Sequence, residues 1–151
     1  MIRSGSLSLR ARALAHLARR EHSRVELARK LAAHASDEHE VNAVLDALEQ
    51  AGHLSTARFV ESLVRKRAAR YGLRRVEQEL AEHKIDPELK RPMIQSLKDS
   101  EGERAWQAWE RRFGQPPADL TERARQQRFL VARGFTGDAV AAVFSRLRDR
   151  G

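Results

Sequence analysis

The sequence predicts an all-α protein, an elongated and curved array of three tandem three-helix repeats. Helix formers such as Ala, Leu, Arg, Glu and Gln dominate the chain, and no segment alternates polar and apolar residues as a strand would. Helix-capping signals return at short intervals. The same succession of three short helices recurs roughly every 45–50 residues, which is typical of repeat architectures. The predicted repeats span residues 1–53, 54–98 and 99–151.

The first repeat is predicted from its apolar spacing and its caps. An apolar stripe that starts at Leu7 indicates a helix over about residues 8–20. Ser23, with a glutamate three residues later, forms a capping box and opens a second helix. Asp37 opens a third helix, and Gly52 closes it as a C-terminal cap.

The second repeat shows the same order of signals. A helix opens at Ser55 or at the threonine after it, and Gly72 separates it from the next helix. The Asp-Pro pair at residues 86–87 opens the third helix, with proline at the first helical position, where its missing N–H costs nothing. Leu89 falls on the apolar stripe of that helix, and Pro92 is expected to kink or shorten it.

The third repeat is predicted to start after a break at residues 100–102. Its first helix ends before two adjacent prolines, Asp119 caps a helix whose apolar set starts at Leu120, and Thr136 caps the last helix. We therefore expect nine helices. None of them can bury its apolar stripe alone, so stacking of neighbouring repeats supplies the core. A compact single bundle is the alternative.

Composition excludes several classes of protein. The chain has 151 residues, of which 33% are charged and 41% hydrophobic, so it can form a modest core. Cysteine is absent, which excludes disulfides, thiolate metal sites and cysteine nucleophiles. There is no apolar run of about 18 residues and no signal-peptide core at the start, so we expect a cytoplasmic protein without a membrane span. An Arg-rich transit peptide is the alternative reading of residues 1–12.

The charge balance favours a polyanionic or acidic partner. Lys and Arg total 29 against 21 Asp and Glu, giving a net charge of +8. Residues 54–98 carry 11 basic and 6 acidic side chains, so the second repeat is the most positive, at +5. Within it, six basic residues fall in an eleven-residue stretch without an acid, namely Arg65, Lys66, Arg67, Arg70, Arg74 and Arg75. Like charges at helical spacing repel, so we interpret this segment as a phosphate or acidic-partner contact. A solvated helix face is the alternative.

Aromatic and catalytic signals carry less information. Tyr71, Phe113, Phe129 and Phe135 adjoin basic residues, as in a stacking platform for bases, but they fall on apolar stripes and are interpreted as core. The same holds for the tryptophan pair at residues 106 and 109. No phosphate-binding glycine loop, nucleophile–base set or histidine pair at metal-binding spacing is present, so we expect no enzyme, no metal and no cofactor.

Three local patterns then resemble the RecX family of bacterial recombination regulators, over about residues 8–149. The first is Arg19-Arg20 with Ser23, Glu26-Leu27 and Lys30-Leu31. The second is Tyr71-Gly72 with Arg75-Val76, Glu79-Leu80 and Ile85. The third is Arg128-Phe129-Leu130 with Arg133-Gly134-Phe135. The basic positions of these patterns join the candidate contact residues, which adds Arg19, Arg20, Lys30, Arg128 and Arg133.

The resemblance implies a function. Members of this family are expected to bind in the groove of the filament that the RecA recombinase forms on single-stranded DNA, and to damp its ATP hydrolysis, strand exchange and coprotease activity. The filament supplies the ATP, so the chain itself needs no cofactor. We expect a monomer with weak direct DNA binding. Two alternatives remain, a stand-alone DNA-binding protein that uses helix-turn-helix-like units and a helical scaffold without a nucleic-acid role.

Overall fold

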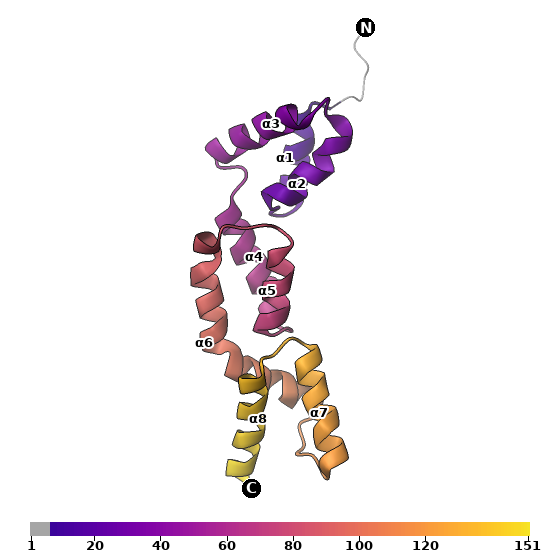
Figure 1. The fold of residues 1–151 in the computed structure, drawn as a ribbon, viewed down its shortest axis with the longest axis vertical. Helices are drawn as coiled ribbons and strands as arrows, with labels where there is room; N and C mark the ends of the chain where they lie inside the picture. The colour runs from indigo at the N-terminus through magenta and orange to yellow at the C-terminus, as the bar shows by residue number, and fades with distance from the viewer. Residues whose placement is uncertain (1–6) are drawn as a thin grey trace.

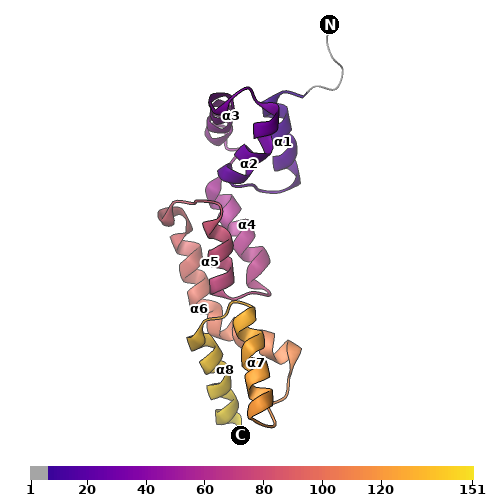
Figure 2. The same ribbon diagram turned by 45° about the vertical axis from the view of Figure 1, so that its right-hand side comes forward.

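The computed structural model describes residues 7–151. Over this range it contains α-helices and one short 3-10 helix, η1, with no β-strand, and the helices follow one another along an elongated molecule (Figure 1; Figure 2). The elements are α1 (Leu9–Arg19), α2 (Arg24–Leu31), η1 (Ala32–His34), α3 (Glu38–Gln50), α4 (Thr56–Ala68), α5 (Leu73–Ala81), α6 (Pro87–Arg112), α7 (Leu120–Ala132) and α8 (Gly137–Arg150).

Most helices begin at the capping residues that the sequence predicts. The backbone N–H of Glu26 donates to the Ser23 hydroxyl, and the N–H of Ser23 donates to the Glu26 carboxylate, which completes the capping box. Gly52 has φ 79°, the left-handed conformation that commonly closes a helix. Side-chain oxygens cap the other predicted starts, at Asp37, Ser55, Asp86, Asp119 and Thr136.

The prediction of nine helices is wrong, because one helix serves two repeats. α6 runs from Pro87 to Arg112, through Pro92 and through residues 100–102, where the sequence predicts a break. Pro92 lies near the start of α6 and removes one backbone hydrogen bond, and Gly102 costs about 1 kcal/mol relative to alanine. Packing offsets both costs, since α6 lies against α4 of the second repeat and α8 of the third.

Three separate apolar cores lie along the molecule, one in each group of three helical segments. The first lies among α1, α2 and α3, the second among α4, α5 and the first half of α6, and the third among the rest of α6, α7 and α8. Their fully buried members include Leu27 and Leu45, then Val76 and Leu80, then Leu130 and Phe135. The predicted all-helical array of three tandem three-helix repeats is therefore confirmed.

Three leucines that the spacing assigns to the core are exposed. Leu7 precedes α1, Leu89 lies in the first turn of α6, and Leu120 is the first residue of α7, with 84% of its surface exposed. Leu7 lies just before its helix and the other two lie in the first turn, in each case ahead of the turns that pack on neighbouring helices. Apolar periodicity therefore predicts which face of a helix is buried, but it does not predict whether the residues of the first turn are buried.

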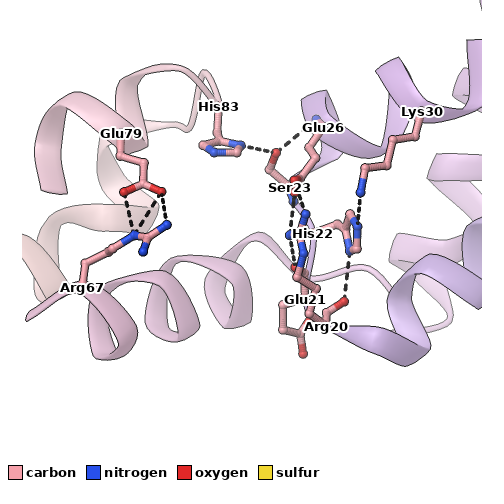
Figure 3. Close-up of polar contacts among 9 residues, drawn as sticks. All are labelled: Arg20, Glu21, His22, Ser23, Glu26, Lys30, Arg67, Glu79 and His83. Atoms are coloured by element: carbon pink, nitrogen blue, oxygen red, sulfur yellow. Dashed lines mark hydrogen bonds and ion pairs between the residues drawn. The ribbon is translucent and has the colours of Figure 1, made fainter. Parts of the chain in front are cut away.

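The contact between the first and second repeats includes several polar side chains (Figure 3). The Ser23 hydroxyl, which caps α2, also lies 2.6 Å from Nδ1 of His83, just after α5. The His83 ring packs on Phe59, with ring centroids 4.6 Å apart. Arg58 on α4 donates from Nε to the Glu21 carboxylate at 2.9 Å. These contacts join two repeats that each have a core of their own.

The contact between the second and third repeats depends on Glu101, a buried residue inside α6. Its Oε1 accepts hydrogen bonds from the backbone N–H groups of Leu73 at 3.0 Å and Thr136 at 3.3 Å. One carboxylate therefore satisfies donors at the beginnings of α5 and α8, where backbone N–H groups lack helical partners. Beside it, the N–H of Gly72 donates to the carbonyl of Arg133 at 2.8 Å, so the turns before α5 and α8 touch.

This close approach predicts opposite effects of two Gly→Ala substitutions. A Cβ on Gly72 would collide with the backbone nitrogen of Phe135, whereas a Cβ on Gly102 meets nothing within 4 Å. We expect Gly72→Ala to lower the free energy of unfolding by about 3 kcal/mol, because backbone must move. Gly102→Ala should raise it by about 1 kcal/mol, because alanine favours the helix. Urea unfolding followed by circular dichroism measures both, and equal effects would contradict the contact.

The buried histidine of the first repeat predicts a pH dependence of stability. His22 is 2% exposed, with Nδ1 3.0 Å from the carbonyl oxygen of Arg20 and Nε2 3.0 Å from Nζ of Lys30. Burial, together with the charges of Arg20 and Lys30, lowers its pKa below the ordinary value of 6.5, although the hydrogen bond to the Arg20 carbonyl and the Glu26 carboxylate act in the opposite direction. Burial likewise lowers the pKa of the neighbouring His16.

A histidine whose folded pKa is lowered binds a proton more readily in the unfolded chain. The free energy of unfolding should therefore be constant above about pH 7 and fall as the pH drops below about 6.5 toward the lowered pKa values. Thermal melts between about pH 7.5 and pH 5 test this. His22→Gln should lower the melting temperature at the upper pH and flatten its dependence on pH. An unchanged slope in that variant would show that His22 does not contribute.

Candidate functional site

The fold gathers the predicted basic segment at the turn between α4 and α5. Its residues occupy the last turn of α4, the following turn and the first turn of α5, in the order Arg65, Lys66, Arg67, Arg70, Arg74 and Arg75. The N–H of Arg74 donates to the carbonyl of Gly134 at 3.0 Å, next to the Gly72–Arg133 bond. Arg133, at the end of α7, is thereby placed at the same turn as the second-repeat arginines.

Two of these arginines already have carboxylate partners. Arg67 donates from Nε to Glu79 on α5 at 2.9 Å, and its Nη2 donates to the other oxygen of that carboxylate (Figure 3). These hydrogen bonds raise the pKa of the Arg67 guanidinium. Arg65 pairs with Glu61 one turn earlier on the exposed face of α4. Glu79 lies outside the acid-free stretch, so the pairing of Arg67 could not be read from that stretch alone.

Of the remaining arginines of the segment, Arg70 borders a groove that the sequence did not predict, whereas Arg74 and Arg75 do not line it. This junction groove has a volume of about 480 Å³ and lies where α4, α6 and α7 end. Four arginines line it, which we call its rim, together with two alanines and a phenylalanine, which we call its floor, and no acidic side chain lines it. The lining residues are Arg70, Arg111, Arg112, Arg133, Ala69, Ala108 and Phe129.

Arg111 and Arg112 belong to this surface although the sequence analysis did not select them. Both lie in the last turn of α6, and Nη2 of Arg111 donates to the carbonyl of Ala69 at 3.0 Å. Arginine at a helix C-terminus also interacts favourably with the helix dipole, so local structure accounts for part of this basic clustering. The available signal was the Arg-Arg-Phe sequence at residues 111–113, but only the fold places it beside Arg70.

The aromatic rings near the groove are covered by this chain's own cations. The Arg75 guanidinium lies 4.2 Å from the centre of the Tyr71 ring, and the Arg133 guanidinium lies 5.6 Å from it. Phe129 packs edge-on against Phe113. The expectation that Phe135 and both tryptophans belong to the core is confirmed, since each is at most 3% exposed. Tyr71, in contrast, is only half-buried.

The remaining candidate residues lie away from this turn or have local partners. Arg19 and Arg20 end α1 and Lys30 lies on α2, all in the first repeat. Arg20 pairs with Glu26 at 2.5 Å, and Lys30 contacts the buried His22 (Figure 3). Arg128 is exposed on α7, about one helical turn before Arg133. The structure thus brings together the second-repeat arginines and Arg133, and leaves the first-repeat cations separate.

Residues 7–151 hold neither a cluster of metal-binding side chains nor a membrane-spanning helix. No group of three His, Asp or Glu side chains there is arranged to hold a metal ion. No helix in the described part of the chain is both long and apolar enough to cross a membrane. The polar side chains described above cap helices, join repeats or surround the junction groove.

Fold and surface define a class of protein, a helical-repeat protein with an arginine-rich surface where its second and third repeats meet. The chain also matches, in order, the family models of the first, second and third three-helix domains of RecX, at residues 10–48, 57–90 and 99–144. The protein belongs to the RecX family.

Relatives and solved structures agree with this assignment. The chain is 53% identical to the regulatory protein RecX of Leptothrix cholodnii over 143 residues, which cover 95% of this chain and 90% of that protein. It is 51% identical to the regulatory protein RecX of Ralstonia pickettii, over 92% of this chain and 87% of the relative. The crystal structure of RecX from Lactobacillus salivarius shares the fold, with a TM-score of 0.77 at 17% identity over 93% and 94% of the two chains. The chain therefore has a regulatory role of the RecX type.

Proposed function

We propose that this protein binds the filament of RecA on single-stranded DNA and inhibits its recombinase, ATPase and coprotease activities. Membership of the RecX family supports a regulatory role, and the resemblance noted in the sequence supplies RecA as the partner. The protein acts by binding and catalyses nothing itself. ATP belongs to the filament, and the regulator acts as a monomer in the cytoplasm, where RecA assembles on DNA.

The observation that carries this proposal is a set of six arginines at one junction without an ion-pair partner among residues 7–151. They are Arg70, Arg74, Arg75, Arg111, Arg112 and Arg133. Several arginines elsewhere in the described part of the chain form ion pairs, whereas these six gather at one junction, where they can meet acidic side chains or phosphates. The molecule is elongated, and this surface lies where its second and third repeats meet (Figure 1).

Charge reversal at this surface should abolish inhibition without unfolding the protein. Arg70, Arg74 and Arg75 are exposed, so replacing all three with Glu should leave helicity and melting temperature nearly unchanged. Inhibition of single-stranded-DNA-dependent ATP hydrolysis by RecA should weaken at least about tenfold, because three attractive contacts become repulsive. The concentration of protein that halves the hydrolysis rate gives this ratio.

A matched control variant has the same change in net charge, but its three substitutions lie outside the junction of the second and third repeats. Arg10, Arg29 and Arg148 are exposed and form no ion pair within the described residues. Their triple Glu variant should inhibit RecA as the unmodified protein does. Normal inhibition by the Arg70, Arg74, Arg75 variant would remove this surface from the proposal. Absence of inhibition by the unmodified protein would overturn the proposed function itself.

The stand-alone DNA-binding alternative makes a different prediction. A net charge of +8 should give weak binding to DNA of any sequence, with an affinity that falls steeply as salt rises. Fluorescence anisotropy with labelled oligonucleotides over a salt series measures this. The turn before α5 is occupied by the third repeat, which argues against α5 acting as a free recognition helix. Strong preference for one duplex sequence at physiological salt would favour the alternative.

A further inference from the structure

The junction groove differs from the rest of the basic surface, because it combines a cationic rim with an apolar floor. We propose that it binds the carboxylate side chains of an acidic, partly apolar segment of a protein partner. This inference rests on the proposed function and refines it, since it assigns the groove to the protein of the filament and not to its DNA.

The guanidinium groups of the rim have no carboxylate partner within the described residues and can therefore bind the carboxylates of another protein. Arg70, Arg111, Arg112 and Arg133 form no ion pair among residues 7–151, and no acidic side chain lines the groove. The hydrogen bond from Arg111 to the Ala69 carbonyl fixes one guanidinium in place before a partner arrives. A guanidinium binds a carboxylate through two parallel N–H donors, as Arg67 and Arg125 do with glutamates inside this chain.

The floor of the junction groove would contact the apolar side chains of the partner segment. Ala69, Ala108 and Phe129 present small side chains and a half-buried ring between the arginines. Such a floor accommodates an aliphatic side chain, while flanking carboxylates reach the rim. The charged phosphate groups of a nucleic acid would gain nothing from contact with this apolar surface.

The rings around the groove are poorly placed to bind bases. Single-stranded nucleic acids usually bind through open aromatic faces on which bases stack. The guanidinium groups of Arg112 and Arg133 lie 5.8 and 5.1 Å from the centre of the Phe129 ring. Arg75 lies 4.2 Å from the centre of the Tyr71 ring. Bases would have to displace these cations, whereas carboxylates would pair with them where they already are.

Two probes of equal net charge test the proposal on the full-length protein. One is a short fluorescein-labelled peptide of alternating Glu and Leu, and the other is a labelled oligothymidylate. At physiological salt we expect the peptide to bind at least about tenfold more tightly than the oligothymidylate, because only the peptide uses both floor and rim. A peptide with Gln in place of Glu should not bind measurably. Equal or tighter binding of the oligothymidylate would overturn the proposal in favour of nucleic acid.

Substitutions test whether the peptide binds in the junction groove. Arg70→Glu with Arg112→Glu should weaken peptide binding at least about tenfold, whereas the control pair Arg10→Glu with Arg29→Glu should change it less than about twofold. Equal losses in the two pairs would mean that only net charge matters, and the groove would be refuted. If the Glu pair perturbs the fold, Arg70→Gln with Arg112→Gln removes the charges more gently and must still weaken binding.

The same variant separates this inference from the proposed function. If Arg70→Glu with Arg112→Glu loses the peptide but inhibits RecA as the unmodified protein does, the groove is not the partner contact and the inference fails, while the proposed function stands. If the unmodified protein does not inhibit RecA, the proposed function fails whatever the peptide does. Joint loss of peptide binding and inhibition is the expected result.

Discussion

The buried carboxylate of Glu101 is the interaction on which the functional half of the molecule depends. It accepts hydrogen bonds from the first N–H of α5 and from the N–H of Thr136, the residue that caps α8. Without this acceptor, donors would be left unpaired in a buried site, which costs about 1–3 kcal/mol for each group. The turns before α5 and α8, which contain Gly72 and Gly134, are then in direct backbone contact, and this contact joins the second and third repeats.

That joint determines where the arginines lie. Arg74 and Arg75 begin the helix that Glu101 caps, and Arg133 precedes the glycine that contacts them. A surface held by backbone hydrogen bonds loses little conformational freedom when a partner binds, which favours affinity. The contact between the first and second repeats, formed by single side-chain contacts such as Ser23 with His83, places no comparable surface. The basic junction therefore belongs to the second and third repeats.

Much of this fold could be predicted from local signals. Caps such as Ser23 and Asp119 act within a few residues, so the sequence reveals them, and apolar spacing indicates the three repeats. The continuity of α6 could not be predicted, because Glu101 and Gly102 resemble a helix break until their distant partners are known. The basic segment at residues 65–75 could be predicted from its local composition. The pairing of Arg67 and the groove lined by Arg111 depend on contacts between helices, which no local pattern records.

The central claim is that the arginines at the junction of the second and third repeats meet the filament. Arginine-selective labelling with phenylglyoxal, read by mass spectrometry, tests it directly on the unmodified protein with and without RecA on single-stranded DNA. We predict that Arg70, Arg74 and Arg112 react more slowly in the complex, while Arg10 and Arg29 react as before. Protection confined to the first repeat, or unchanged reactivity at the junction in a complex shown to form, would contradict the account.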